Sequence, residues 1–359
     1  MKKSIYIRDI FILITLLLAL SGASCFNTGK EPAPGGSLRF EQNFIGPFDT
    51  VTTLLAYCED EASFRQLEDL VSEDLDHYHT LFDFYNNYAG VNNIKTINDE
   101  AGKTEVDADQ VIIDFLEQCK WAADITDGRV NVAFGSVLSI WHRQRTEGLE
   151  NPSEAKLPKR AELEQANLHT NIEKLQIDRE AGTVYLQDPH MSLDVGSGAK
   201  GFACELITEH AIAAGFDSFV LSLGGNVRCV GVKADSGEKW NIGIKNPDVE
   251  AENKVLDVLS VSDMAIVTSG IYERYYTVGE IRYHHIIHPN TLMPSEFFDS
   301  VTLIAPDARV ADALTTALLN MPLEEGQELV AELEDCEALW IKDGRRYKTA
   351  GYDTLLAAD

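Results

Sequence analysis

The sequence predicts an α+β fold with mixed or antiparallel sheets and flanking helices. Three observations favour this class. Two long amphipathic stretches lie in the N-terminal third, short apolar runs separated by turns begin near residue 219, and two further helical patterns follow residue 307. Strands and helices are therefore grouped and do not strictly alternate, which is typical of α+β proteins.

Helices are expected where apolar residues recur every three or four positions, as Leu67, Val71 and Leu75 do. Four such segments precede residue 216, at residues 63–82, 107–125, 159–166 and 202–214. Gly215 ends the last of them. Residues 86–102 are rich in Asn and Gly, which predicts a loop between the first two helices.

Seven short strands are expected after this point, at residues 220–223, 227–232, 240–244, 256–261, 272–277, 282–287 and 301–304. Each is an apolar or aromatic run bounded by turn residues. Two helices and a final strand complete the expected order, at residues 308–320, 324–334 and 338–341.

The first residues have the pattern of an export signal. Lys2, Lys3 and Arg8 precede an apolar run at residues 10–20, and small residues then lead to Cys25. This run of about eleven residues is too short to cross a hydrocarbon core of ~30 Å. The segment resembles a bacterial lipoprotein signal, which implies cleavage before Cys25 and lipidation of that cysteine.

Three parts are therefore expected along the chain. Residues 1–24 are a signal peptide, residues 25–40 hold the lipid-attachment site Cys25 and a flexible Gly- and Pro-rich tether, and residues 41–359 form one large domain. We expect an exported protein, lipid-anchored to the outer face of the bacterial cytoplasmic membrane or periplasmic.

The chain is strongly acidic. Its formal net charge of −28 becomes −30 when residues 1–24, with three basic and one acidic residue, are removed. Nucleic acid and anionic membrane surfaces are poor partners for such a domain. A phosphate ligand would need local lysines, backbone dipoles or a metal to overcome this field.

The cysteines show neither a disulfide framework nor a zinc pattern. Apart from Cys25, the chain has five, an odd number, without a short CxxC spacing. Each lies among apolar neighbours, so we expect small core residues. Export would still permit one or two disulfide bonds.

Residues 194–201 read Asp-Val-Gly-Ser-Gly-Ala-Lys-Gly and suggest an anion site. The three glycines allow the backbone to approach an anion closely, and Lys200 supplies a positive charge. A helix from residue 202 would direct its N-terminus towards a phosphate. The alternative is a tight connection before a helix, without a ligand.

Residues 311–317 read Ala-Asp-Ala-Leu-Thr-Thr-Ala. Asp312 and Thr316 are four positions apart, so a helix would place both oxygens on one face as ligands of a hard cation. Alternatively, Asp312 is only an exposed side chain and Thr316 bonds its own backbone. Together with residues 194–201, this segment suggests a magnesium-assisted site for a pyrophosphate.

Two further segments contain glycine at a strand end. In residues 221–228 a strand breaks at Gly224 and Gly225, which a hairpin turn alone would explain. Residues 268–276 have the pattern of a turn into an aromatic strand.

Residues 284–288 contain three histidines. On a strand, His284 and His288 would share a face with Ile286, and His285 would face the other way. Zinc sites usually add a fourth ligand at a defined spacing, and none is evident here, which disfavours zinc. For His285 the alternatives are an acid–base group and a hydrogen-bonded surface histidine.

Taken in order, these segments resemble the ApbE-type flavin transferase family, the FAD:protein FMN transferases. The resemblance covers the whole expected domain, with matches at Phe48-Asp49-Thr50, Thr126-Asp127-Gly128 and residues 311–317. Its most specific segments are Asp194…Lys200-Gly201, Gly224-Gly225-Asn226, Ser269-Gly270, His285-Ile286-Ile287-x-Pro289 and Asp312…Thr316. The resemblance implies a single large T-fold-like domain.

The resemblance also implies a reaction. The FMN half of FAD is transferred through a phosphoester bond to a threonine hydroxyl of a partner flavoprotein, and AMP is released. FAD is then a substrate and Mg²⁺ the cofactor that bridges its pyrophosphate. In that family the metal is held by the positions matching Asp312 and Thr316 and by the main-chain carbonyl at Ala199.

Two implied roles are catalytic. His285 would deprotonate or order the acceptor threonine, and Lys200 would hold phosphate oxygens. The remaining implied contacts to the flavin nucleotide come from the glycine-rich segment, the hairpin and one hydroxyl, at Asp194, Gly196, Gly201, Gly224, Gly225, Asn226 and Ser269.

Two other functions fit the same residues. Water as the acceptor would give an FAD pyrophosphatase that releases FMN and AMP, and a surface lipoprotein that only binds flavin would need no metal pair. The acceptors that the resemblance offers are subunits of Rnf-type or sodium-pumping NADH reductases and secreted FMN-binding reductases. The sequence selects none of them, and it predicts contact with the membrane only through the lipid anchor.

Overall fold

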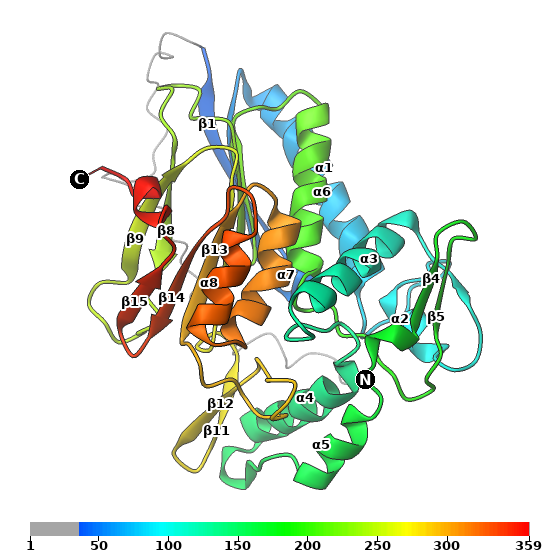
Figure 1. Ribbon diagram of the computed structural model, residues 1–359. Coiled ribbons are helices and arrows are strands. Elements are labelled where there is room, and N and C mark those ends of the chain that lie inside the picture. Colours follow the sequence, from blue (N-terminus) through cyan, green and yellow to red (C-terminus); the bar gives the residue numbers. More distant parts are fainter. Residues whose placement is uncertain (1–35, 359) are drawn as a thin grey trace.

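A computed structural model describes residues 36–358 and shows one α+β domain built around an eight-stranded sheet (Figure 1). The strand order is β1-β2-β6-β7-β10-β13-β14-β15, and all neighbours are antiparallel. In that order the strands are Leu38–Ile45, Val51–Cys58, Phe219–Leu223, Asn226–Val230, Ala265–Gly270, Ser300–Ala305, Glu337–Lys342 and Arg345–Lys348.

Three small sheets and eight α-helices complete the described chain. The small sheets are β3-β5-β4 (Val106–Asp107, Thr183–Leu186, Leu175–Asp178), β8-β9 (Trp240–Lys245, Val255–Val261) and β11-β12 (Tyr275–Val278, Ile281–His284). The helices are α1 (Glu61–Phe82), α2 (Ile94–Asp99), α3 (Gln110–Ile125), α4 (Gly135–Glu150), α5 (Arg160–Asn167), α6 (Ala199–Ala213), α7 (Ala308–Leu319) and α8 (Leu323–Ala331).

The central strands are buried on both faces. Leu221 and Leu303 belong to the core under the helices, whereas the adjacent Val220 and Ile304 belong to the core under the β8–β9 hairpin. Successive side chains of a strand point to opposite faces, so both members of each pair are apolar. This double burial explains why the strands read as short continuous apolar runs.

The N-terminal boundary of the domain lies earlier than expected. β1 begins at Leu38, so residues 38–40 of the expected tether belong to the sheet. Phe40 stacks on Phe64 of α1 with ring centroids 4.9 Å apart, which holds this strand against the core. The expected signal peptide and Cys25 lie outside the described residues. Within residues 36–358, no helix is long and apolar enough to cross a membrane.

α2 lies where the Asn-rich sequence predicts a loop, so that prediction was wrong. Asn93 and Thr96 form a capping box, in which each side chain accepts a hydrogen bond from the other residue's backbone. The buried Asn93 amide also donates to Thr80 O at 3.1 Å. Asn therefore starts a helix here because its side chain is held by α1.

Several other elements were not predicted. They are α4, the three-stranded β3-β5-β4 sheet and the strands β1, β2, β10 and β15. The strand expected at residues 272–277 is present as β11 but begins at Tyr275, whereas Ser269 and Gly270 belong to the central strand β10, which pairs with β13. The expected strand at residues 282–287 ends at His284, where the chain turns to pair with residues 293–295.

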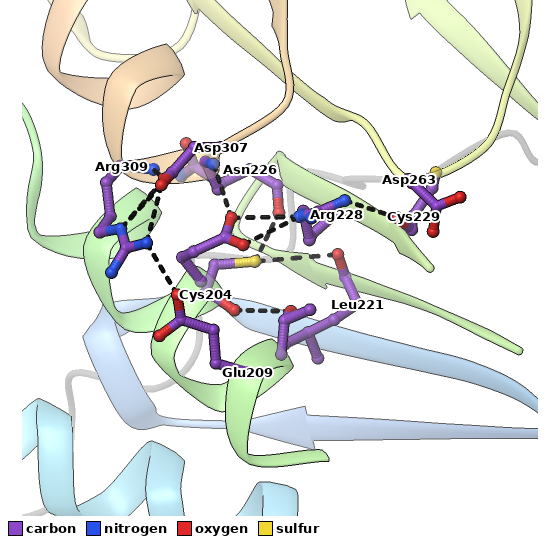
Figure 2. A network of polar contacts seen from close by, with 12 residues as sticks. Cys204, Glu209, Leu221, Asn226, Arg228, Cys229, Asp263, Asp307 and Arg309 are labelled. Atoms are coloured by element: carbon purple, nitrogen blue, oxygen red, sulfur yellow. Dashed lines mark hydrogen bonds and ion pairs between the residues drawn. The ribbon is translucent and has the colours of Figure 1, made fainter. Parts of the chain in front are cut away.

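A buried ion pair joins α6, β7 and the start of α7 (Figure 2). Arg228 Nε lies 3.1 Å from Glu205 Oε2, which also accepts a hydrogen bond from Ala308 N at 2.7 Å. Burial raises the pKa of Glu205, and the charge of Arg228 opposes this effect. Because the carboxylate binds the first amide of α7, it fixes the register between the two helices.

The five cysteines of the described chain are free thiols, and Cys58, Cys204 and Cys229 are buried. This confirms the prediction of core residues for these three. Cys119 and Cys336 are only partly buried.

Candidate active site

The glycine-rich segment leads directly into α6. Asp194 Oδ1 accepts a hydrogen bond from Gly196 N at 3.0 Å, which fixes the turn before the helix. The helix begins at Ala199, three residues before the expected start, so Lys200 and Gly201 lie in its first turn. The sequence prediction was wrong because Gly198 already serves as the N-cap. First-turn amides are the donors that bind anions at helix N-termini.

α7 places Asp312 and Thr316 one turn apart, as predicted. Asp312 Oδ2 accepts a hydrogen bond from Gly201 N at 2.7 Å, so its carboxylate lies at the N-terminus of α6. The Asp312 side chain is only 5% exposed, which excludes the alternative of a solvated surface residue. Thr316 is partly exposed beside it.

Gly201 is required by the close contact between α6 and α7. A Cβ atom on Gly201 would lie 2.3 Å from Asp312 Cβ and 2.4 Å from Ala308 O. Both distances are far below van der Waals contact, and both atoms belong to a packed helix. Only glycine therefore allows the carboxylate to reach the α6 amides.

Substitution of Gly201 by alanine should lower the free energy of unfolding by about 1–3 kcal/mol, because the added methyl group forces the two helices apart. Chemical denaturation checks this value. Gly198→Ala is the matched control, since a Cβ there meets Phe115 at an ordinary 3.5 Å and the cost is limited to a weaker N-cap. Equal stability of Gly201→Ala and wild type would contradict the close packing.

Asp312 and Thr316 of α7 and Ala199, the first residue of α6, offer oxygen donors of the kind that magnesium binds. A carboxylate, the Thr316 hydroxyl and the Ala199 carbonyl are all hard ligands, which Mg²⁺ prefers. Only one carboxylate oxygen of Asp312 is hydrogen-bonded to Gly201. Residues 36–358 contain no cluster of three or more His, Cys, Asp or Glu side chains for a metal. A site made of one carboxylate, one hydroxyl and one carbonyl requires no such cluster.

Ser269 is connected to the same helix. Its hydroxyl donates to Thr315 Oγ1 at 2.9 Å, and the Thr315 hydroxyl donates to Asp312 O at 3.2 Å. Ser269 lies in β10 and not in a turn. Its hydroxyl therefore ties the central sheet to the turn of α7 that carries the carboxylate.

Gly224 and Gly225 form the two-residue turn between β6 and β7, as the hairpin alternative stated. Both have positive φ, 56° and 93°, which favours glycine in this tight hairpin. A Cβ on Gly224 would also lie 2.7 Å from Thr50 Oγ1. The next residue, Asn226, is 2% exposed and its Oδ1 has no hydrogen-bond partner among the described residues.

His285 lies just after β12, at the base of the β11–β12 hairpin. Its backbone N–H donates to Arg274 O at 3.1 Å, and its Nδ1 lies 3.1 Å from the same oxygen. A carbonyl can only accept, so Nδ1 carries the proton and Nε2 holds a free lone pair. Burial, with the charges of Arg274 and Arg145, lowers the pKa of His285 to about 3. The imidazole is therefore neutral at physiological pH.

The low pKa of His285 has a consequence for stability. In the unfolded chain a histidine takes up a proton below a pKa of about 6.5, whereas the folded protein does not do so until about pH 3. Acidification through this window therefore favours the unfolded state. Between pH 7 and pH 5, the free energy of unfolding of wild type should therefore fall by about 1–2 kcal/mol more than that of His285→Gln. Denaturant titrations at the two pH values measure this difference. An identical loss in both proteins would contradict the low pKa.

The other two histidines of this segment have structural partners. His284 Nε2 lies 2.9 Å from Ser295 O, and His288 Nε2 lies 3.2 Å from an Arg129 nitrogen. His284 and His288 are fully buried and His285 is half-buried, but the alternation fails at Ile287, which is also fully buried. The strand expected through these residues ends before the alternation can continue.

The sequence patterns missed three site residues. His142 and Arg145 lie on α4, and His142 Nδ1 is 3.8 Å from Asp194 Oδ2. Burial lowers the pKa of His142, and Asp194 opposes this effect. The third residue is Arg274, whose carbonyl holds His285. The spacing of His142 and Arg145 was the available signal, but it carries meaning only on a helix, and α4 was not predicted.

Hydrogen bonds thus connect part of the predicted site. Asp194, Gly196 and Gly201 surround the start of α6 and reach Asp312, and Ser269 is linked through Thr315. His285 is held by Arg274 O and has no hydrogen bond to this group within the described chain, whereas His142 of α4 lies near Asp194.

Comparison with known proteins identifies the family. The ApbE family model matches residues 48–340. An FAD:protein FMN transferase of Treponema pallidum is 32% identical over 272 residues, which cover 72% of each chain. One of Klebsiella pneumoniae is 29% identical over 253 residues, which cover 70% of this chain and 75% of the relative.

Solved structures share the fold. The ApbE protein of Thermotoga maritima has a TM-score of 0.77 at 26% identity, covering 89% of this chain and 100% of its own. The flavin transferase ApbE of Vibrio cholerae has a TM-score of 0.74 at 23% identity with the same coverage. The prediction of a single ApbE-like α+β domain is thereby confirmed. The chain belongs to the ApbE family, and its activity class is that of a transferase enzyme.

Proposed function

We propose that this protein is a Mg²⁺-dependent FAD:protein FMN transferase. It would move FMN from FAD to a threonine hydroxyl of a partner flavoprotein and release AMP. The observation that carries the proposal is the 2.7 Å hydrogen bond between Gly201 N and Asp312 Oδ2. This contact supports the proposal because the carboxylate of Asp312, the proposed cation ligand, lies beside a helix N-terminus that favours anions, and a metal-bound pyrophosphate needs both.

Phosphate oxygens would be held by the first turn of α6. The backbone amide of Lys200 and the positive end of the helix dipole attract an anion, and the partly exposed Lys200 side chain adds a full charge. These local charges offset the repulsion of a chain with a net charge of −28. Asp312, Thr316 and the Ala199 carbonyl would hold Mg²⁺, which would neutralise charge on the pyrophosphate.

His285 would act as the general base. The acceptor hydroxyl oxygen forms a bond to the phosphorus on the FMN side, and the bond from this phosphorus to the bridging oxygen breaks. AMP leaves with the electron pair, and the hydroxyl proton passes to Nε2 of His285. Because Nδ1 is occupied by Arg274 O, the ring presents the nitrogen that can accept this proton.

Two further residues support nucleotide contacts. Asn226 Oδ1 has no partner among the described residues and remains an acceptor for a donor group of the nucleotide. The hydroxyl proton of Ser269 is used by Thr315, so Ser269 would contact a ligand only through its oxygen lone pairs. Gly224 and Gly225 keep the hairpin free of side chains at the same end of the sheet.

We also propose export and a lipid anchor at Cys25, on the strength of the N-terminal pattern. The acceptor would then be an extracytoplasmic flavoprotein, such as a subunit of an Rnf-type or sodium-pumping NADH reductase or a secreted FMN-binding reductase. A threonine in an exposed turn of such a domain could reach a site that lies at one end of the central sheet.

Intact-mass analysis of an acceptor tests the function. Residues 26–359 would be incubated with FAD, Mg²⁺ and a purified FMN-binding domain of an Rnf-type subunit. A mass gain of one FMN phosphoester, absent with EDTA, is the expected result. Release of FMN and AMP without acceptor modification would show an FAD pyrophosphatase, and binding of FAD without turnover would show a flavin-binding lipoprotein.

A further inference from the structure

α6 and α7 lie side by side over the same face of the central sheet (Figure 1). Each helix provides a carboxylate to a backbone amide of the other. Asp312 Oδ2 of α7 accepts a hydrogen bond from Gly201 N at 2.7 Å. In return, Glu205 Oε2 of α6 accepts a hydrogen bond from Ala308 N, also at 2.7 Å. We call these four residues the helix clasp.

The spacing of the helix clasp prevents movement of one helix along the other. On each helix the amide and the carboxylate are four residues apart, which is about one turn or ~6 Å along the axis. Gly201 and Ala308 lie in first turns, whose amides have no acceptor within their own helix. Each carboxylate also meets the positive end of a helix dipole. α7 therefore cannot slide along α6 without breaking one of the two bonds.

Glu205 is itself held by a buried arginine of β7. Arg228 Nε lies 3.2 Å from Glu205 Oε1 and 3.1 Å from Oε2, and both side chains are buried. A second ion pair joins the same two helices, between Arg309 and Glu209, and it is more exposed (Figure 2). Glu209 accepts no backbone hydrogen bond from α7 within the described chain, so only Glu205 combines the ion pair with a bond to the α7 backbone.

The ion pair connects the two sides of the proposed site. Arg228 is two positions after Asn226 on β7, so both side chains point to the same face of the sheet. Asn226 Oδ1 is the proposed acceptor for a donor group of the nucleotide. Arg228 and Glu205 thus join the strand that carries this acceptor to the helix that carries Asp312.

We propose that Glu205 is a positioning residue for the metal site. By binding Ala308 N, it fixes α7 so that the carboxylate of Asp312 meets the start of α6. Both oxygens of Glu205 are engaged by Arg228 and Ala308 N, so the residue acts on the site through α7. Groups that hold a metal ligand in place typically change metal affinity or activity about 10- to 100-fold when they are removed. The inference rests on the proposed function in one respect, the role of Asp312 as a metal ligand.

A first test measures the helix clasp without flavin, metal or turnover. Hydrogen–deuterium exchange at the start of α6 would be followed in residues 26–359. In Glu205→Ala the Gly201 amide should exchange about 10-fold faster, because α7 loses its hold on α6 and the bond to Asp312 opens more often. Glu209→Gln is the matched control on the same helix and should exchange as wild type does. Wild-type exchange in Glu205→Ala would overturn the proposal.

A second test distinguishes positioning from a general loss of stability. The Mg²⁺ concentration for half-maximal single-turnover transfer, at saturating FAD and acceptor, should rise about 10-fold or more in Glu205→Ala. Glu205→Gln should recover part of this loss, because its amide oxygen can still accept from Ala308 N while Arg228 loses its counter-charge. Leu259→Ala, in the core under the β8–β9 hairpin, is the control for stability. It should lower the thermal transition without changing the Mg²⁺ requirement.

An unchanged Mg²⁺ requirement in Glu205→Ala would make the residue purely structural and overturn the proposal. If Glu205→Ala does not fold, as judged by its thermal transition, Glu205→Gln supplies the comparison. Wild-type exchange at Gly201 together with a wild-type Mg²⁺ requirement in this variant would count against the proposal.

A metal-binding measurement separates this inference from the proposed function. If the wild type transfers no FMN, Mn²⁺ binding in the presence of FAD, followed by electron paramagnetic resonance, replaces the transfer rate. Weaker Mn²⁺ binding in Glu205→Ala than in wild type and Glu209→Gln would keep the positioning role while the transferase proposal fails. Equal Mn²⁺ binding in the three proteins would overturn the positioning role.

Discussion

Asp312→Asn is expected to lower the rate of FMN transfer on the order of 10³-fold at saturating FAD, because the proposed magnesium site would lose its only carboxylate ligand. The amide oxygen can still accept the hydrogen bond from Gly201 N, so the contact between α6 and α7 is retained. The decisive measurement is the single-turnover rate as a function of Mg²⁺ concentration, in which the variant should lose most of its response to the metal.

Asp312→Ala should be inactive for the same reason and less stable. The lower stability is expected because the Asp312 side chain is buried and binds Gly201 N. Alanine would leave this buried amide unpaired, at a cost of about 1–3 kcal/mol. Asp307→Asn, at the N-cap of α7, is the matched control for Asp312→Asn, since aspartate and asparagine both cap helices well. A wild-type rate for Asp312→Asn at low Mg²⁺ would remove the metal assignment.

His285→Ala is expected to slow transfer on the order of 10²-fold or more, with little change in FAD affinity. The ring supplies the Nε2 lone pair that takes the hydroxyl proton, and this lone pair is not needed to bind FAD. Added imidazole should restore part of the rate in the variant. His210→Ala, a histidine of α6 paired with Asp74, is the control and should keep the wild-type rate.

The pH dependence of transfer gives a second measure of His285. The neutral ring is the active form, and its pKa is lowered to about 3 by burial and by Arg274 and Arg145. The rate should therefore not fall through protonation of His285 between pH 7 and pH 5. Equal losses of transfer and FAD affinity in His285→Ala would make the residue a binding group. An acid limb near pH 6.5 in wild type would contradict its depressed pKa.

The sequence by itself determined the features that depend on short-range patterns. The 3.6-residue periodicity identified α1, α3 and α7, and the four-residue spacing placed Asp312 and Thr316 on one face of α7. Two adjacent glycines identified the β6–β7 hairpin, because its turn needs positive φ at both positions. These signals act within one or two turns of chain, so no tertiary contact was needed to interpret them.

Where local sequence preference and tertiary packing disagree, only the tertiary structure determines which element forms. The Asn-rich segment before residue 100 forms α2 because Asn93 is buried against α1. β1 and β10 are strands because their partners pair with them. Periodicity cannot show pairing between segments that are far apart in sequence.

The features of the site also fall into two groups, those that the sequence shows and those that only the tertiary structure explains. Its glycines, Lys200, Asp312 and His285 are visible in the sequence as residue types and spacings. The reason for Gly201 and the neutral state of His285 are not. They arise from the crossing of α6 with α7 and from the packing of α4 against the β11–β12 hairpin. Burial and charge at a site depend on which distant segments surround it, and only the folded chain brings those segments together.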